Sequence, residues 1–318
     1  MLAPHLRGGN SFDDVRVDLP AAFAVQDDWL RMVEKRSVRR SRIRNTAALA
    51  AFAAEWRFRL REPLVASGVR HRWFDEFNGY WTEVIGGRPL TIADFHGLRF
   101  EYRRRAQISH ELDWGSAEQH LSNWADPANL AATFLYVYRE ALQPLRSRAL
   151  RRLLGRGGRV LEYGCSLAPM YRTWRAFHSH VPCSWVLADI PTFPFHFARH
   201  AYARDAEASF VTISVDQLDD PLSGVADGFD LILVQEVFEH LHAPRRMAEY
   251  LLDRLNSGGL FAFDYIAKSS ALGHDTPAGV DERIETLEYL AGQLEVVHGR
   301  LRVGPETVSL CAGRRRGG

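Results

Sequence analysis

The chain has 318 residues, of which 46% are hydrophobic and 25% charged, as expected of a soluble globular protein with one large or two modest domains. A formal net charge of +1 argues against a nucleic-acid partner, and no run approaches the roughly 18 apolar residues of a membrane helix. Three widely spaced cysteines form neither a disulfide framework nor a zinc motif. We therefore expect a cytoplasmic protein without a bound metal.

The N-terminal half carries mainly helical patterns. We expect residues 1–20 to be irregular and residues 21–155 to form a helical domain that covers a substrate pocket. Asn45–Thr46 can cap an Ala-rich helix, and the apolar residues of Trp73–Ile85 recur at helical spacing. Asp126–Pro127 is a cap followed by proline, which predicts a further helix beyond it.

The pattern changes at residues 155–158, where strand-like and helix-like segments begin to alternate. This order predicts an α/β fold, a doubly wound, Rossmann-like sheet of seven strands over residues 156–313. Phe229–Val234 is apolar throughout, as in a central strand, and Leu255–Gly259 supplies a turn before the fifth strand. Residues 314–318 are interpreted as a solvated tail. The expected strands are residues 159–163, 184–189, 209–214, 229–234, 260–266, 293–298 and 306–311.

The first two strands of this alternation carry the most informative residues. The first ends in an acid and turns through Gly164 into a helix that starts near Ala168. About 25 residues later, the second strand ends in the lone carboxylate of Asp189. A glycine turn lets a ligand approach the backbone, and a carboxylate at the second strand can accept both hydroxyls of a ribose. The pattern predicts a nucleotide-type pocket.

Three motifs in order resemble the class I S-adenosylmethionine-dependent methyltransferases. They are VLEYGCS at residues 160–166, the strand ending at Asp189, and the segment 229–261 with its Glu-His-Leu and Gly-Gly. The resemblance covers about residues 155–313. It implies S-adenosylmethionine as cofactor, bound at the carboxyl edge of the sheet. The cofactor-binding residues that it implies are Glu162, Tyr163, Gly164, Ser166, Ala168, Asp189, Ile190, Asp216, Gln217, Gln235 and Glu236.

The resemblance also implies roles for these residues. Glu162 and the loop after it would bound the methionine part of the cofactor, and Asp189 would hold the ribose with Ile190 against the adenine. Asp216 and Gln217 would meet the adenine amino group. Gln235 and Glu236, which follow the fourth strand, would face the cofactor and form the floor of the acceptor site.

The chain departs from the family pattern in the loop after the first strand. Ser166 and Ala168 stand where the family usually has glycine, and the serine hydroxyl could bond the cofactor carboxylate. Tyr163 stands where a smaller residue is usual. Its ring could face the sulfonium and stabilise the positive charge, or it could pack against the helical domain.

A polar and aromatic segment, Trp114–Trp124, lies where a lid over the cofactor would be expected. The residues expected to close the pocket are Asn123, Trp124, Tyr136 and Tyr138. The same aromatic residues could instead belong to a core. Tyr163, Asn123 and His240 are the catalytic candidates, with helix-surface packing as the alternative for His240.

The leading hypothesis is methyl transfer to a small molecule by in-line displacement at the sulfonium. An alternative is a cyclase similar to the azetidine-2-carboxylate synthases, in which the amine of the cofactor attacks its own γ-carbon and releases methylthioadenosine. A second alternative is a non-catalytic module that binds the cofactor. The expected partner is a small-molecule substrate, with neither nucleic acid nor membrane, and the Trp-rich helical domain could form a homodimer.

Overall fold

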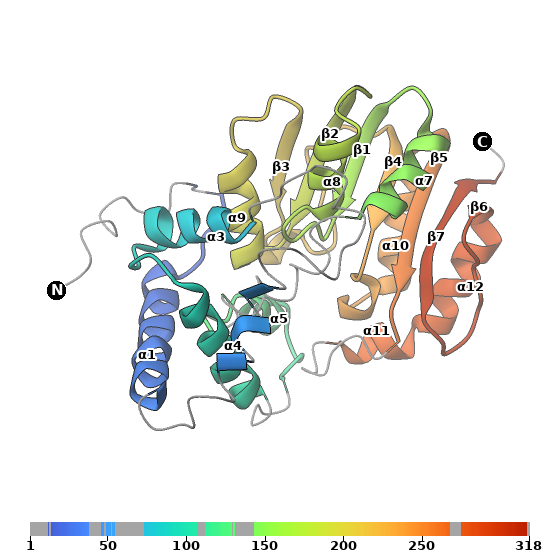
Figure 1. Ribbon diagram of the computed structural model, residues 1–318. Helices are drawn as coiled ribbons and strands as arrows, with labels where there is room; N and C mark the ends of the chain where they lie inside the picture. The colour runs from blue at the N-terminus through green and yellow to red at the C-terminus, as the bar shows by residue number, and fades with distance from the viewer. Residues whose placement is uncertain are drawn as a thin grey trace. The chain divides into compact units, whose positions relative to one another are not determined.

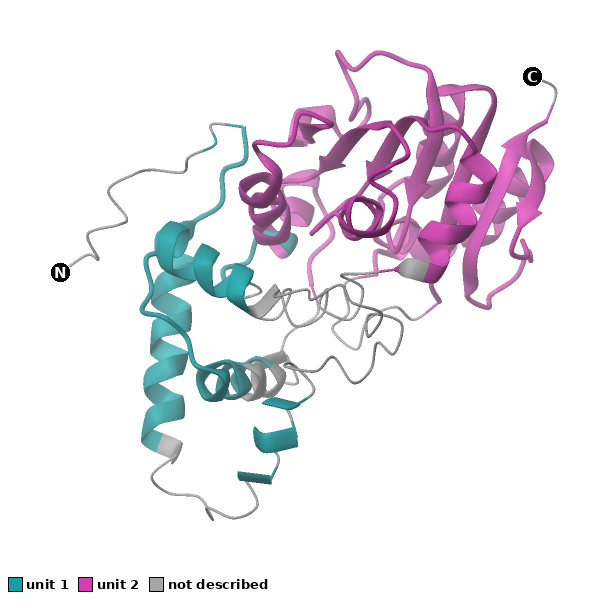
Figure 2. Ribbon diagram, turned by 45° about the horizontal axis from the view of Figure 1, so that its top comes forward, with its two compact units in different colours: residues 1–110, 124–140 teal, residues 111–123, 141–318 magenta. Residues whose placement is uncertain are grey.

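The computed structural model describes residues 12, 14–37, 46–47, 49–51, 53–54, 73–106, 112–128, 130, 143–267 and 275–316 (Figure 1). The chain divides into two compact units, coloured separately in Figure 2: unit 1 holds residues 1–110 and 124–140, and unit 2 holds residues 111–123 and 141–318. The boundary predicted after residue 155 therefore differs from the observed one. Within the described ranges, no helix combines the length and apolar character needed to cross a membrane.

Unit 1 is helical where it is described. Its elements are α1 (Leu19–Ser37), α3 (Trp73–Tyr80), the π-helical turn η3 (Trp81–Ile85) and α4 (Ile92–Ala106). The helical spacing read over Trp73–Ile85 is thus confirmed. Gly97 lets α4 approach α1, because a Cβ at Gly97 would lie 2.4 Å from Val33 Cγ1. Asp126 Oδ1 accepts the Ala128 N–H at 2.8 Å, but most of the helix expected beyond it lies outside the described residues.

Unit 2 contains the sheet. Its helices are α5 (Ala117–Trp124, whose last residue is assigned to unit 1), α7 (Pro144–Leu154), α8 (Pro169–Phe177), α9 (Phe193–Tyr202), η5 (Val215–Gln217), η6 (Phe238–His240), α10 (Pro244–Asp253), α11 (Pro277–Asp281) and α12 (Arg283–Gln293). Its strands are β1 (Gly158–Tyr163), β2 (Cys183–Asp189), β3 (Ala208–Thr212), β4 (Phe229–Val234), β5 (Leu255–Tyr265), β6 (Leu294–His298) and β7 (Val308–Arg315).

The strand order is β3-β2-β1-β4-β5-β7-β6. Strands β1 to β5 pair in parallel, and β7 pairs antiparallel with both β5 and β6. This arrangement confirms the predicted doubly wound, seven-stranded α/β fold.

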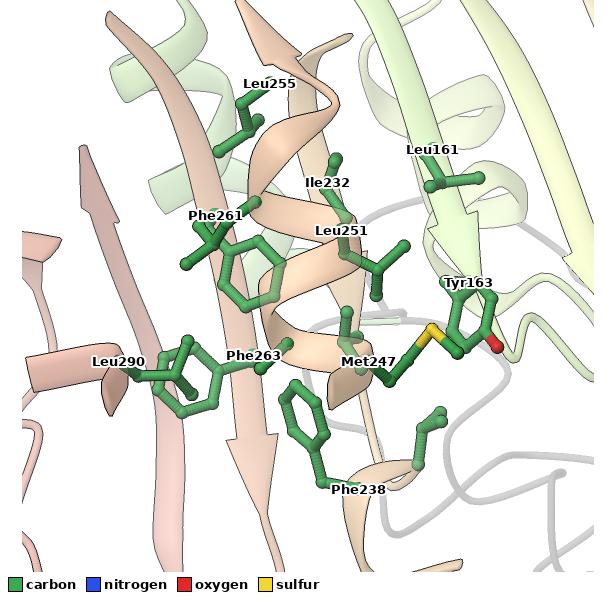
Figure 3. Close-up of a cluster of buried hydrophobic side chains, with 14 of the residues drawn as sticks. Leu161, Tyr163, Ile232, Phe238, Met247, Leu251, Leu255, Phe261, Phe263 and Leu290 are labelled. Carbon is green, nitrogen blue, oxygen red and sulfur yellow. The ribbon is translucent and has the colours of Figure 1, made fainter. Parts of the chain in front are cut away.

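Alternating side chains of the strands fill the two faces of the sheet. Leu161 on β1 and Ile232 on β4 belong to one buried cluster with Met247 and Leu251 of α10 (Figure 3). On the opposite face, Glu162 bonds the first turn of α8. Burying each large aliphatic side chain stabilises the fold by about 1.5–3 kcal/mol, so both faces must be covered by helices.

Two predictions about the C-terminal part are wrong. Leu255–Gly259 is not a turn before β5 but its first part, where the register with β4 shifts between Phe229 and Leu231. Residues 314–316 are not a solvated tail either. Arg314 and Arg315 end β7, Arg314 donates to the carbonyl oxygens of Gly258 and Leu153, and the Arg316 side chain donates to the Leu294 carbonyl. These arginines satisfy carbonyl groups at a strand bulge and at helix and strand ends.

Candidate functional site

The first four parallel strands end at the same edge of the sheet. β1 ends at Tyr163, β2 at Asp189, β3 at Thr212 and β4 at Val234. The residues predicted to bind the cofactor lie at these ends or directly follow them. In open parallel sheets, ligands bind at this edge, where the chain leaves adjacent strands in opposite directions. The structure therefore brings the predicted cofactor-binding residues to one edge, and their contacts with a ligand stay predictions.

The loop after β1 is fixed by Gly164 and by bonds to β2. The backbone N–H groups of Gly164 and Cys165 both donate to the Ala188 carbonyl, at 2.8 and 3.1 Å. Gly164 has φ 65°, and a Cβ there would lie 2.4 Å from Val237 Cγ2. Both the left-handed backbone and the close contact require glycine at this position.

Two residues of the same loop adopt left-handed backbone conformations without being glycine. Ser166 has φ 49° and Ala168 has φ 52°. This conformation places Cβ close to the carbonyl oxygen and costs an L-residue about 1–2 kcal/mol. The loop after β1 therefore carries backbone strain at two positions.

Glu162 caps helix α8. Its two carboxylate oxygens accept the N–H groups of Met170 and Tyr171, both at 2.9 Å. The N-cap residue Ala168 has no acceptor in its side chain, and Pro169 has no N–H, so a remote carboxylate serves the second and third residues of the helix. Burial raises the pKa of Glu162 to about 7, against the opposing effect of the two backbone donors. Its direct contact with the cofactor stays a prediction.

Asp189 is held rigidly at the tip of β2. Its Oδ2 accepts the Ser166 N–H at 2.6 Å, and its Oδ1 accepts the Ile190 N–H at 2.7 Å. Burial raises the pKa of Asp189 to about 7, although both hydrogen bonds favour the charged form. Each oxygen keeps a further lone pair, so this carboxylate can still accept two ligand hydroxyls. Ile190 itself packs at the margin of the core cluster.

The residues after β3 form a local capping motif. Gln217 Oε1 accepts from the Ser214 backbone N–H at 3.3 Å and from the Ser214 hydroxyl at 2.8 Å. The exposed carboxylate of Asp216 accepts from the same hydroxyl at 2.6 Å, and this bond lowers its pKa. Asp216 thus remains ionised and open to solvent, as a contact to an adenine amino group would need.

The residues after β4 include an unsatisfied amide. Both Gln235 Oε1 and Gln235 Nε2 are buried, and neither has a hydrogen-bond partner in the described part of the chain. Glu236 has φ 53° and donates its backbone N–H to Asp264 Oδ1 at 2.6 Å, so this strained turn is tied to β5. Buried polar groups are normally paired, so this unpaired amide at the sheet edge is an exception, and its predicted contact with the cofactor stays a prediction.

Sequence reasoning missed Glu239, which lies in η6 between the expected residues Glu236 and His240. It is 1% exposed, and neither carboxylate oxygen has a hydrogen-bond partner within the described ranges. Its place in the Glu-His-Leu motif was visible, but its burial was not. His240 itself faces Asp275, with 3.6 Å between Nδ1 and Oδ1. It is on a 3-10 turn, and its predicted catalytic role stays a prediction.

Asn123 lies in α5 and bonds within its own segment. Its Nδ2 donates to the Asp113 carbonyl at 2.7 Å, and its Oδ1 accepts from Gln119 Nε2 at 3.0 Å. These bonds fix the turn before α5, so the amide is already used inside the protein. Trp124 ends α5, while Tyr136 and Tyr138 lie outside the described residues.

A second missed residue, His120, connects α5 to the segment after β4. Its ring centroid lies 4.5 Å from that of His242 and 5.2 Å from that of Trp114. His120 is buried, and its Nδ1 lacks a hydrogen-bond partner among the described residues. Burial, followed by the proximity of His242 and His240, lowers the pKa of His120 to about 3. No spacing in the sequence links the residue on α5 to these two histidines.

Tyr163 is a core residue of unit 2. It is buried in the cluster that includes Leu161 and Val234, and Figure 3 shows it beside Met247 of α10. The packing that the structure shows for Tyr163 lies within the core of unit 2, and the alternative expected from the sequence, packing against the helical domain, stays a prediction. The predicted contact between its ring and a sulfonium stays a prediction.

Among the described residues, no group of three or more histidine, cysteine, aspartate or glutamate side chains is arranged to hold a metal ion.

Comparisons with known proteins give a family match. The family model described as "Methyltransferase domain" matches residues 134–300, about half of the chain. No curated protein matches the chain. Similar solved structures include the N-methyltransferase NodS from Bradyrhizobium japonicum WM9 (20% identity, 54% of this chain and 94% of that chain, TM-score 0.38). An O-methyltransferase family protein from Burkholderia thailandensis (13% identity, 70% of each chain, TM-score 0.46) is another. The plantazolicin methyltransferase BpumL in complex with SAH is a third (13% identity, 69% of this chain and 99% of that chain, TM-score 0.45).

Proposed function

Because this chain belongs to the methyltransferase domain family and uses S-adenosylmethionine, we propose that it transfers the methyl group of this donor to a small molecule. The observation that carries the proposal is the position of Asp189. Its carboxylate lies at the tip of β2, is held by two backbone N–H groups, and keeps lone pairs for a ribose diol.

The residues at this sheet edge fit the donor. Asp189 provides the acceptors for two ribose hydroxyls, and Gln235 offers a buried donor and a buried acceptor that lack partners in the described chain. The loop from Gly164 to Ala168 lies at the same edge, and its large side chain, Leu167, is buried in the protein. A nucleoside with a polar amino-acid end matches this set of groups.

Methyl transfer by in-line displacement requires mainly that the donor and the acceptor are aligned. When bound, S-adenosylmethionine supplies a methyl group activated by a positively charged sulfur. Asp189 and the loop after β1 would hold the donor, while the residues after β4 would orient the acceptor for in-line attack. The buried Gln235 amide supports a site from which water is excluded, where opposite charges interact more strongly than in water.

Calorimetry with S-adenosylhomocysteine tests whether Asp189 binds the cofactor as proposed. Replacing Asp189 with alanine should weaken binding at least about tenfold, because hydrogen bonds to a charged group are lost. Asp219 is an exposed aspartate whose carboxylate pairs with Arg246, so Asp219→Ala serves as the matched control and should bind normally. Unchanged affinity in Asp189→Ala would show that the ribose lies elsewhere.

Product analysis tests the reaction. Incubation with S-adenosylmethionine and a mixture of small metabolites should yield S-adenosylhomocysteine only when the acceptor mixture is present. Release of methylthioadenosine from the donor alone would instead support the cyclase. Asn123, one of the predicted catalytic residues, already bonds Asp113 and Gln119. If the chain binds S-adenosylhomocysteine but forms neither product, the result would support the non-catalytic module.

The cellular setting is also a proposal. All three cysteines, Cys165, Cys183 and Cys311, are buried and unpaired, which supports a cytoplasmic location. We propose a small-molecule partner and neither nucleic acid nor membrane, as the net charge of +1 suggests. The homodimer expected from the Trp-rich helical part stays a prediction.

A further inference from the structure

Arg146 is an arginine near the sheet edge whose capacity for hydrogen bonds is mostly unused. It is the third residue of α7, and its side chain is 33% exposed. Its partner among the described residues is the buried carboxylate of Asp264 on β5, with 3.5 Å between Nη1 and Oδ2. This distance is at the limit for a hydrogen bond, and a guanidinium has five N–H donors. Arg254, by comparison, reaches Asp227 at 2.7 Å and Asp220 at 3.2 Å.

Two sets of hydrogen bonds place Arg146 at the carboxyl edge of the sheet. Asp264 Oδ1 accepts the Glu236 N–H at 2.6 Å, so one carboxylate joins Arg146 to the turn after β4. At the start of α7, the Gln143 N–H donates to Thr173 Oγ1 of α8 at 2.8 Å. Helix α8 itself begins directly after the loop that follows β1. The first turn of α7 is thus tied both to the helix after β1 and to the turn after β4.

A structural role for Arg146 accounts for only part of this arrangement. As a counter-ion, Arg146 compensates the charge of Asp264, which lies in the interior. The bond of Asp264 to the Glu236 N–H is nevertheless shorter than its contact with the guanidinium. The counter-ion role explains neither the exposure of the arginine nor its unused donors.

The residues predicted to bind the cofactor include no cation. None of them is lysine, arginine or histidine, and their acids are Glu162, Asp189, Asp216 and Glu236. S-adenosylmethionine carries a carboxylate at its amino-acid end, beside an ammonium group and the sulfonium. Acids suit the two positive groups, but a carboxylate that leaves water needs a cation or several N–H donors. The forked guanidinium of an arginine binds a carboxylate through two parallel hydrogen bonds.

We propose that Arg146 binds a ligand carboxylate at the ends of β4 and β5, with Asp264 holding the guanidinium in place. The inference rests on the proposed methyl transfer and adds a residue to its site. Two molecules of that reaction can supply the carboxylate: the donor, through its amino-acid end, and an acceptor that is itself a carboxylic acid. Binding uses the N–H donors that Asp264 leaves free, so no bond inside the protein has to break.

Calorimetry on the full chain with two matched ligands tests the donor as the source of the carboxylate. S-adenosylhomocysteine has the amino-acid carboxylate, and its decarboxylated analogue keeps the amine but lacks this group. The original chain should bind the analogue at least about tenfold more weakly, because a charge-assisted pair is lost. Arg146→Gln should bind S-adenosylhomocysteine at least about tenfold more weakly than the original chain, and the analogue within about twofold of it.

Three further variants separate a ligand contact from a structural role. Arg146→Lys keeps a cation beside Asp264 without the forked geometry, so it should fold and show an intermediate preference for S-adenosylhomocysteine over the analogue. Arg148→Gln, at an exposed arginine of α7, is the matched control and should change neither affinity. Asp189→Ala should weaken both ligands alike, because both carry the ribose, so failure of the ribose contact is not confused with failure of the carboxylate contact.

Titration of carboxylic acids into the S-adenosylhomocysteine complex tests the acceptor as the source. The ligands are acetate, succinate, benzoate and 4-hydroxybenzoate, each beside its primary amide. If S-adenosylhomocysteine binds equally well to Arg146→Gln, we expect one of the acids, and not its amide, to bind the complex of the original chain and not that of the variant. If the original chain binds neither adenosine ligand, the proposed function fails, and the same titration of the free chain decides the role of Arg146.

Two results overturn the inference. One is an equal loss of affinity for S-adenosylhomocysteine and its analogue in Arg146→Gln, which is the result expected of a counter-ion for Asp264 alone. The other is that neither S-adenosylhomocysteine nor any of the acids binds the original chain better than Arg146→Gln.

Discussion

At the scale of single residues, the carboxylates at the sheet edge act as acceptors for backbone N–H groups. Glu162 caps α8, Asp189 holds the loop after β1, and Asp264 holds the turn after β4. Each acid therefore orders a loop that would otherwise leave buried N–H groups unpaired. Glu162 and Asp189 could be predicted to lie at strand ends, because an acidic residue after an apolar run is a pattern of neighbouring residues. It did not indicate that the protein's own backbone is their first partner.

The strained serine of the β1 loop gives a stability prediction. Ser166→Gly should raise the free energy of unfolding by about 1 kcal/mol, because glycine adopts φ 49° without the clash of a Cβ. Urea unfolding measures the change. Ser184→Gly, at an exposed position of β2, is the control and should lower stability by about 0.5–1 kcal/mol. A less stable Ser166→Gly would mean that its hydroxyl contributes more than the backbone costs, and calorimetry would then show whether it also binds the cofactor.

The raised pKa of Asp189 predicts a pH dependence of binding. The ionised carboxylate is the form that accepts two hydroxyls, and its pKa is about 7 because the group is buried. Affinity for S-adenosylhomocysteine should therefore be highest above pH 7 and fall by up to about tenfold per pH unit below it. Calorimetry from pH 5.5 to 8.5 checks this, and Asp189→Asn should flatten the profile. A flat profile for the original chain would contradict the assigned role.

At the scale of elements, α5 is the segment whose position the sequence left open. Residues 111–123 belong to unit 2, and the contact of His120 with His242 and Trp114 joins α5 to the segment after β4. This contact requires a neutral imidazole, because the buried ring has lost hydration and lies close to His242 and His240.

Acid should therefore loosen α5. The pKa of His120 is lowered from 6.5 to about 3, so the free imidazole takes up a proton more readily than the packed one. The packing is fully present above pH 6.5 and weakens as the pH falls toward 3. Hydrogen exchange of residues 117–124, corrected for intrinsic rates, should be faster relative to the sheet at pH 5 than at pH 7.

A substitution separates this effect from general acid unfolding. His120→Phe keeps a ring but cannot titrate, so exchange in α5 should no longer depend on pH beyond the intrinsic rate. His180→Gln, at an exposed histidine, should retain the dependence. Equal protection of α5 in the original chain at both pH values would rule out His120 as the cause.

At the scale of the whole molecule, the alternation of strands and helices predicted the sheet well. All seven strands were expected in about the right places, because a buried parallel strand is a run of apolar residues that can be read locally. The division of the chain into two units was harder to predict from the sequence. α7 and the segment 111–123 belong to the sheet unit, and their helical pattern does not say which surface they pack on.

The amino-acid sequence by itself determined the fold class and which polar residues stand at the strand ends along one sheet edge, since each follows from local periodicity and motif order. Only the tertiary structure decided which of these polar groups already have partners. Glu162 and Asn123 are satisfied inside the protein, while Gln235 and Glu239 lack partners in the described chain. The reason is physical: the satisfaction and burial of a polar group depend on atoms brought together by folding from distant parts of the chain.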